Sequence, residues 1–161
     1  MKIGLVSDTH MPSRAKALPA ELMAALAGVE LILHAGDLNT LAVLRELGEL
    51  ADVEAVAGNT DPWEVANLLG DRYQVELEGV SIGLTHGHLG RGTTTPDRAV
   101  SRFTGARVVV FGHSHRPRIE ARGGVLLVNP GSPTDPRGAP QRTCAILTVE
   151  CGQARAELVG W

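Results

Sequence analysis

Short apolar runs that end on histidine, aspartate or asparagine are the feature that most constrains the fold of this chain. The chain has five groups of such polar residues, and these groups contain all six histidines. They are Asp8-Thr9-His10, His34-Ala35-Gly36-Asp37, Gly58-Asn59-Thr60-Asp61, His86-Gly87-His88 and Gly112-His113-Ser114-His115. Four of the five follow directly on a run rich in Val, Leu or Ile. A buried parallel strand has this composition and presents the next residues to a cleft. The pattern predicts an α/β fold whose strand ends deliver polar side chains to one place.

The first 60 residues alternate between strand and helix patterns. Strands are predicted over 3–7, 31–34 and 53–57, where most residues are apolar. A helix is predicted over about 18–28 from apolar residues at helical spacing, and Leu41, Leu44 and Leu47 mark a second helix. Strands that alternate with helices in this way form a parallel sheet with right-handed crossovers.

The second half of the chain contains predicted hairpins. Strands are expected over 73–77 and 81–85 around Glu78-Gly79, over 119–121 and 125–128 around Gly123-Gly124, and over 145–150 and 154–159. A helix is expected over 97–104, followed by a strand over 108–111. The Pro- and Gly-rich segment 130–140 is predicted to be a surface loop. We therefore expect a two-sheet β-sandwich flanked by helices, as one domain over residues 1–161.

Composition limits the classes of function. The chain has 161 residues, of which 43% are hydrophobic and 20% charged, as in an ordinary globular protein. A net charge of -3 argues against stable nucleic-acid binding. No apolar run is long enough to cross a membrane, so a cytoplasmic protein is expected. Cys144 and Cys151 lack metal-ligand spacing and are expected to be free and buried.

The polar groups contain the ligand types of a metal centre. Asp8 and His10 are two residues apart, so both side chains can enter one cleft where the chain leaves its strand. Turn and cap formation explains single Asp or Asn residues after strands, but it does not explain four histidines in addition. Imidazole and carboxylate ligands without thiolate suit Mn, Fe, Co, Ni or Zn. The sequence therefore predicts a site for divalent metal ions.

The order of the motifs carries a family resemblance. DxH, GD, GNxD, GH and GHxH follow one another at Asp8, Gly36, Gly58, Gly87 and Gly112. This series resembles that of the calcineurin-like metallophosphoesterase superfamily, and in particular its small single-domain bacterial and archaeal phosphodiesterases. A retromer subunit of eukaryotes is related to them. The resemblance extends from Lys2 through Asn129-Pro130-Gly131-Ser132. It implies the αββα fold of that superfamily and a phosphodiesterase that acts on a small phosphoester.

The resemblance also implies a ligand set for two divalent ions. One ion would be held by Asp8, His10, Asp37 and His115, and the other by Asp37, Asn59, His86 and His113. Asp37 would bridge the two ions, and a hydroxide shared between them would attack phosphorus. Manganese is the first expectation for the metal. A phosphomonoesterase or nucleotidase and a non-catalytic protein-binding scaffold are the alternatives.

The chain departs from the family pattern at Thr60. Many members of the superfamily have histidine there, which stabilises or protonates the leaving group, and threonine cannot act as a general acid near neutral pH. His88 is the candidate for that catalytic role, because it is a histidine next to a ligand. His34 and Asp61 are expected to support the ligands, and Trp63 to be a packing residue, with base stacking or a dimer contact as the alternative. Arg14, Arg91 and Arg137 lie in loops and are expected to be solvated surface residues, with a contact to a second anionic group at the cleft as the alternative. The oligomeric state is left open, with a homodimer as one option.

Overall fold

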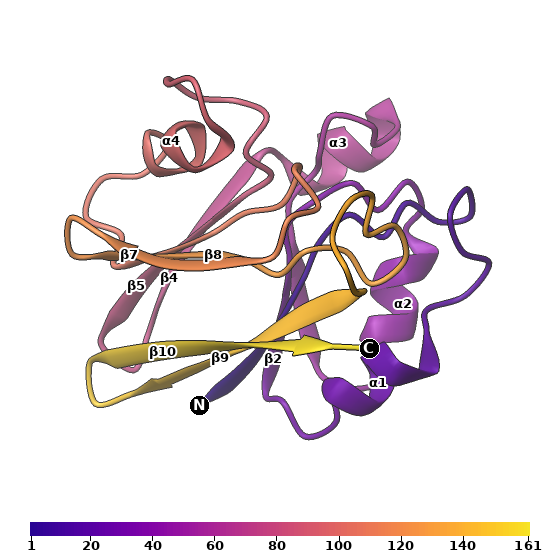
Figure 1. The fold of residues 1–161 in the computed structure, drawn as a ribbon, viewed down its shortest axis with the longest axis horizontal. Coiled ribbons are helices and arrows are strands. Elements are labelled where there is room, and N and C mark those ends of the chain that lie inside the picture. The colour runs from indigo at the N-terminus through magenta and orange to yellow at the C-terminus, as the bar shows by residue number, and fades with distance from the viewer.

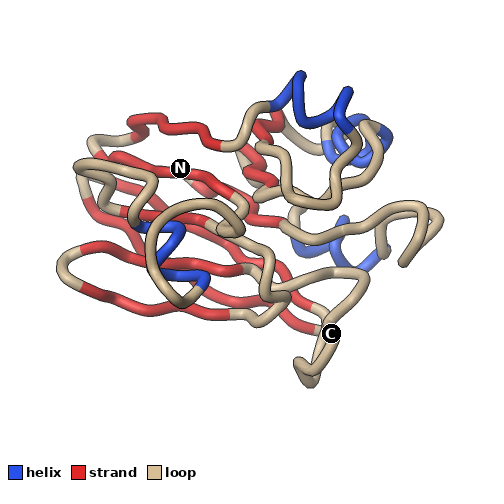
Figure 2. The backbone as a smooth tube through the Cα atoms, turned by 90° about the horizontal axis from the view of Figure 1, so that it is seen from above, coloured by secondary structure: helices blue, strands red, loops and turns tan.

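Two five-stranded β-sheets pack face to face in the computed structural model, which describes residues 1–161. Helices cover the outer faces of both sheets (Figure 1). Figure 2, a view turned by 90°, shows the strands as the body of the molecule, with long loops between them. The predicted α/β sandwich flanked by helices is confirmed.

The first sheet has the strand order β10-β9-β1-β2-β3. Its parallel half consists of β1 (Lys2–Val6), β2 (Leu31–His34) and β3 (Asp52–Ala55), and the short helices α1 (Ala20–Ala25) and α2 (Ala42–Leu47) connect them. A C-terminal hairpin of β9 (Thr143–Glu150) and β10 (Gln153–Gly160) adds to β1 in antiparallel orientation. Val6, His34 and Ala55 lie side by side in the register, so the three parallel strands end at one level.

The second sheet has the strand order β4-β5-β6-β8-β7. The three central strands β5 (Val80–Thr85), β6 (Val108–Val110) and β8 (Val125–Asn129) are parallel, and the edge strands β4 (Arg72–Leu77) and β7 (Arg118–Arg122) are antiparallel to their neighbours. Glu78 and Gly79 join β4 to β5 with φ of 50° and 75°, the left-handed conformation that a two-residue hairpin turn requires. β5 and β6 are parallel neighbours, with Leu84 beside Val110, so the polar groups that follow these two strands begin at one level.

Aliphatic side chains fill three separate layers of core. Between the sheets lie residues such as Ile3, Leu33, Ile82 and Leu147, all fully buried. α1 and α2 cover the outer face of the first sheet through Leu22, Leu26, Val43 and Leu47, while α4 (Thr95–Val100) covers Val109, Phe111 and Leu127 on the second. Each fully buried side chain of this size contributes about 1.5–3 kcal/mol. The sheets are thus held rigidly, and the loops at their ends are anchored to a packed core.

Three helices differ from the sequence prediction. α1 is shorter than the predicted 18–28, and α4 begins before the predicted 97–104 because Thr94 and Asp97 form a reciprocal capping box with Pro96 in the first turn. The helix α3 (Trp63–Leu69) was not predicted, since only Val65 on it is buried and the apolar periodicity is weak. Trp63 begins this helix with 75% of its surface exposed, so its predicted packing role is wrong.

Two loop predictions also need correction. Cys144 is buried, which raises the pKa of its thiol to about 12, but Cys151 is exposed in the β9–β10 turn. Residues 131–134, predicted as surface, are buried because the chain passes beneath the loop that follows β1. No helix is long and apolar enough to cross a membrane.

Candidate metal centre

The ends of five strands bring the predicted ligands together. Asp8 and His10 follow β1, Asp37 follows β2, Asn59 follows β3, His86 follows β5, and His113 and His115 follow β6. Two groups have ligand atoms within 4.8 Å of one another: Asp8, His10 and His115 form one, and Asp8, Asp37 and His86 form the other. All five of these residues are buried. Residues up to 107 positions apart in the sequence thus meet in one cluster.

The backbone at this cluster is strained. Five of the seven predicted ligands have left-handed backbone, with φ between 43° and 69°: Asp8, His10, Asp37, His113 and His115. Few non-glycine residues adopt this conformation, and it persists only where the surroundings impose it. The loops therefore aim these side chains at the expense of local backbone stability.

Close approach of the loops depends on glycine. A Cβ atom at Gly112 would lie 2.6 Å from Asp8 Oδ2, and one at Gly58 would lie 2.6 Å from the Asp37 backbone nitrogen. Any side chain at either position would push a predicted ligand out of place. These two glycines let the loops after β3 and β6 close on the loops after β1 and β2.

Buried hydrogen bonds hold the strained loops. The Asp61 carboxylate accepts from the backbone N–H groups of Asp37 (2.9 Å), Gly58 (2.7 Å) and Asn39 (2.6 Å), which joins the loops after β2 and β3. Ser132 Oγ donates to the carbonyl of Asp8 at 2.8 Å. The predicted support by Asp61 agrees with these bonds. Ser132 belongs to the Asn129–Ser132 motif named above, whereas the sequence analysis did not identify Asn39.

The imidazole orientations test whether a cation fits. His86 Nδ1 donates to the Ala35 carbonyl at 2.7 Å, His115 Nδ1 donates to the Asp135 carbonyl, and His10 Nδ1 donates to Asn39 Oδ1 at 3.0 Å. With Nδ1 carrying the proton, the Nε2 atoms of His10 and His115 are acceptors in the neutral rings. His86 differs. Burial acts to lower its pKa, but its hydrogen bond to Asp37 and the charges of Asp8 and Asp37 outweigh burial and raise that pKa, so Nε2 of His86 also carries a proton until a metal ion displaces it. His10 Nε2 and His115 Nε2 nevertheless face each other at 3.2 Å. Two facing lone pairs repel unless a cation lies between them, so the ring orientations fit a metal site.

The carboxylates complete this cluster of acceptors. Asp37 Oδ2 lies 3.3 Å from His86 Nε2 and 3.6 Å from His10 Nε2, and Asp8 Oδ1 lies 3.4 Å from His115 Nε2. Metal–ligand bonds of about 2.0–2.2 Å place neighbouring ligand atoms about 3–3.5 Å apart. These separations therefore suit atoms that share a coordination sphere.

Asn59 and His113 extend the cluster toward solvent. Asn59 Oδ1 lies 3.1 Å from His86 Nε2 and 3.0 Å from His113 Nδ1. Asn59 is exposed and His113 is half-buried, in contrast to the other five predicted ligands. All seven predicted ligands thus lie in one continuous site whose outer side opens at Asn59 and His113.

The two carboxylates differ in their electrostatic surroundings. Burial raises the pKa of Asp8 to about 7, although the charge of His86 opposes this effect. Burial also acts to raise the pKa of Asp37, but hydrogen bonds from His86 and Thr60 outweigh it and hold that pKa well below its usual range. Asp37 is therefore an anion across the neutral pH range, while Asp8 in the metal-free protein carries a proton near pH 6.

His34 and Thr60 support the cluster. His34 is fully buried beneath it, donates to Thr9 Oγ1 at 3.2 Å, and accepts from the Gly36 N–H. Burial lowers the pKa of His34 to about 3, so this ring is neutral, in agreement with its predicted supporting role. The Thr60 backbone N–H donates to Asp37 Oδ1 at 2.9 Å. Thr60 thus orients the aspartate instead of supplying the imidazole found in many relatives.

His88 lies beside the cluster without belonging to it. Its ring centroid is 5.2 Å from that of His86 and 6.3 Å from that of His113. Burial and the charge of His86 lower the pKa of His88, and the more distant charges of Asp71 and Arg102 act on it in opposite directions. His88 is therefore a neutral imidazole at neutral pH, with one N–H to donate.

The three loop arginines named from the sequence, Arg14, Arg91 and Arg137, have different surroundings. Arg14 and Arg137 both pair with Asp135, at 3.3 and 3.4 Å. Arg91 has no ion-pair partner and lies in the loop after His88. Only Arg91 therefore has a free guanidinium.

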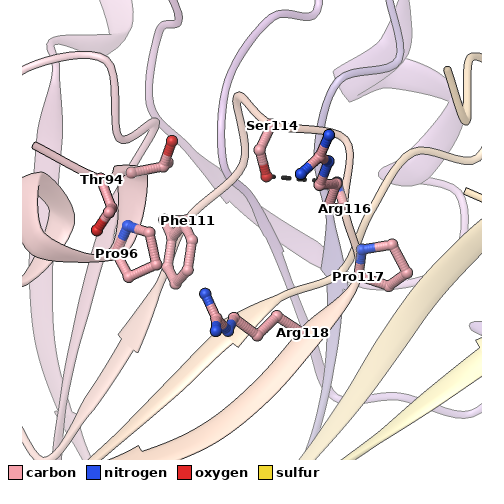
Figure 3. Close-up of a pocket in the computed structure, with 8 residues that line it drawn as sticks. Thr94, Pro96, Phe111, Ser114, Arg116, Pro117 and Arg118 are labelled. Atoms are coloured by element: carbon pink, nitrogen blue, oxygen red, sulfur yellow. Dashed lines mark hydrogen bonds between the residues drawn. The ribbon is translucent and has the colours of Figure 1, made fainter. Parts of the chain in front are cut away.

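A depression of about 520 Å³ adjoins the loop that carries His113 and His115 (Figure 3). Ser114, between these two histidines, lines it together with Thr94, Pro96, Phe111 and Arg116. In Figure 3, Phe111 and the two proline rings at 96 and 117 face this space, and Arg118 enters it from below. The depression offers both apolar and cationic surface beside the loop of His113 and His115.

The fold and the cluster together define a class. Two packed sheets whose strand ends gather imidazoles and carboxylates, with no thiolate, are the construction of a metal-dependent hydrolase. The chain belongs to the calcineurin-like phosphoesterase superfamily, whose domain model matches residues 1–152. The predicted family is confirmed.

Similar proteins agree with this assignment. A probable metallophosphoesterase of Methanothermobacter thermautotrophicus is 40% identical over 99% of this chain and 92% of its own length. The phosphodiesterase YfcE of Escherichia coli K12 is 34% identical over 91% of this chain and 87% of its own. The crystal structure of Vps29 from Chaetomium thermophilum shares the fold, with a TM-score of 0.81, 21% identity, and coverage of 100% of this chain and 97% of that one.

Proton release should accompany metal binding at low pH. The pKa of Asp8 is raised to about 7 in the metal-free protein, so at pH 6 a metal ion must displace its proton, and affinity should increase as the pH rises. Titration calorimetry with Mn²⁺ in buffers of different ionisation enthalpy should detect about one more proton released at pH 6 than at pH 8.5. Equal release at both pH values would contradict the assignment of Asp8 as a ligand.

Proposed function

We propose that this protein is a phosphodiesterase that holds two divalent metal ions. The observation that carries the proposal is the convergence of imidazole nitrogens and carboxylate oxygens in one buried cluster, centred on the 3.2 Å approach of His10 Nε2 and His115 Nε2. The family assignment and the relative named as a phosphodiesterase support a phosphodiester substrate. A depression beside the His113–His115 loop gives room for the second alcohol group that distinguishes a diester from a monoester.

We assign the ligands in two sets that share Asp37. Asp8, His10 and His115 belong to the first set, and Asn59, His86 and His113 to the second. Asp37 Oδ2 lies within 3.6 Å of a histidine from each set, which supports its position as the bridge. Nitrogen and hard oxygen donors are compatible with manganese, our proposal for the metal.

The charge balance of the site favours a phosphate. Two divalent ions carry four positive charges against two carboxylates, and when bound they supply positive charge to phosphate oxygens and lower the pKa of a water that attacks phosphorus. The chain positions these groups in advance, because Asp61 and Ser132 fix the loops and the outer N–H groups of three imidazoles are already paired. These imidazoles are His10, His86 and His115. No rearrangement of the ligands is then needed during reaction.

His88 is our proposal for the group that contacts the leaving oxygen. It lies beside His86 and His113 and is not needed by the cluster. Because its pKa is lowered by burial, the neutral ring would donate a hydrogen bond to the departing oxygen and not act as a strong acid. Such an arrangement favours good leaving groups.

Removing the bridging charge should abolish metal binding and turnover together. For Asp37→Asn we expect loss of bound Mn by elemental analysis and a decrease in kcat/KM of about hundredfold or more on bis(p-nitrophenyl) phosphate. Asp52→Asn, the same change at the exposed start of β3, is the matched control and should match wild type.

Wild type should also hydrolyse bis(p-nitrophenyl) phosphate with a higher kcat/KM than the monoester p-nitrophenyl phosphate. Unchanged turnover in Asp37→Asn would refute the dinuclear mechanism, and a preference for the monoester would favour a phosphomonoesterase.

Removing the His88 ring should slow turnover without removing metal. We expect His88→Ala to keep two ions per chain and to lose about tenfold or more in kcat, with a larger loss for esters of poorer leaving groups. Steady-state kinetics on a series of aryl diesters of increasing phenol pKa would measure this dependence. Full activity across the series would exclude His88 from the reaction.

A further inference from the structure

A second basic site lies next to His88. Arg72 at the start of β4, Arg91 in the loop after β5, and Arg102 just after α4 line a depression of about 570 Å³ with Asp71, Gly90 and Ser101. We refer to it as the arginine depression. Its formal charge is +2, from three guanidinium groups and one carboxylate, in a chain whose net charge is -3.

Two of its three guanidinium groups are free of carboxylates. Arg102 pairs with Asp71 at 2.7 Å, but neither Arg72 nor Arg91 forms an ion pair. The Arg91 backbone N–H donates to Ser101 Oγ at 2.7 Å, which fixes the loop to the end of α4. The unpaired positive charge of Arg91 therefore lies on a loop whose backbone is hydrogen-bonded to the end of α4.

The chain segment from β5 to Arg91 joins the arginine depression to the metal centre. The Thr85 hydroxyl at the end of β5 donates to the Asp71 carbonyl at 3.1 Å, so the rim is tied to the strand that leads into His86 and His88. On its other side, the His88 ring lies 5.2 Å from His86. The same short segment of chain thus carries His86 of the metal centre, His88 beside it, and Gly90 and Arg91 of the arginine depression.

Two buried nitrogen atoms in this region have no hydrogen-bond partner: His88 Nδ1 and Arg102 Nε. Buried polar atoms are nearly always paired, because leaving one unpaired costs about 1–3 kcal/mol. Arg102 Nε is an obligatory donor, so it requires an acceptor. An anionic oxygen would satisfy it.

We propose that the arginine depression binds a second phosphoryl group of the substrate, so that the preferred substrates are phosphodiesters that carry an additional phosphate. The inference rests on the proposed phosphodiesterase function. Guanidinium groups suit this ligand because their planar donors match phosphate oxygens. Arg91 is the main determinant of this phosphate preference. It lies three residues after His88 and, unlike Arg14 and Arg137, has no ion pair with Asp135.

The experiment compares two esters that differ by one phosphate. The p-nitrophenyl ester of thymidine 5′-phosphate is assayed with and without a 3′-phosphate, on wild type and on the double variant Arg72→Gln/Arg91→Gln. Arg45→Gln/Arg155→Gln removes two exposed arginines elsewhere and is the matched control. For wild type and control we expect the 3′-phosphate to lower KM about tenfold. The double variant should lose this preference and keep its kcat and KM for the ester without 3′-phosphate.

A binding measurement separates this inference from the esterase proposal. Titration calorimetry compares thymidine 3′,5′-bisphosphate with thymidine 5′-phosphate, and the preference for the bisphosphate should again depend on Arg72 and Arg91. If wild type binds the bisphosphate preferentially but hydrolyses no ester, the esterase proposal fails and the arginine site stands. Hydrolysis without any effect of the 3′-phosphate, or equal losses in the control, would overturn the arginine site. Inorganic phosphate that inhibits as strongly as the bisphosphate would also overturn it. The arginine depression would then bind a free anion and not a phosphoryl group of the substrate.

Discussion

The convergence of imidazole nitrogens and carboxylate oxygens in one buried cluster is the constraint on which this structure depends. Three imidazoles are fixed by outer hydrogen bonds, so their inner nitrogens face two buried carboxylates and one another. In the absence of a cation this arrangement costs free energy. The cost is seen at Asp8, because burial of its carboxylate raises the pKa of that group to about 7. Binding of divalent metal would turn these contacts into ligand bonds, and metal is therefore expected to stabilise the folded state.

Two sheets are needed to build this arrangement. The parallel half of the first sheet supplies Asp8, Asp37 and Asn59 at one level, and the second sheet supplies the histidines from β5 and β6 across the interface. The aliphatic core between the sheets fixes their separation. Strain is confined to the loops, where five ligands have left-handed backbone and where the Asp61 carboxylate joins two loops through three N–H groups.

The ligands that directly follow strands could be predicted from the sequence, because the same pattern of an apolar run and then polar residues recurs along the chain. Continuous apolar runs locate β1, β2, β5 and β6, and the polar residues after them converge because parallel strands end together. The sequence did not predict α3, which buries only Val65, or the burial of residues 131–134, which depends on hydrogen bonds to the distant Asp8 loop. Nor could it group Arg72, Arg91 and Arg102, since these belong to three segments that meet only in the folded chain.

Crystals grown with Mn²⁺ and measured at the manganese absorption edge would test the central claim most directly. The account predicts two anomalous peaks, one among Asp8, His10 and His115 and one among Asn59, His86 and His113, both in contact with Asp37. The spacing should be about 3.5–4 Å, as in other two-metal phosphoesterases. A single peak, or density that leaves His10 Nε2 and His115 Nε2 in direct contact without an ion, would contradict the dinuclear centre.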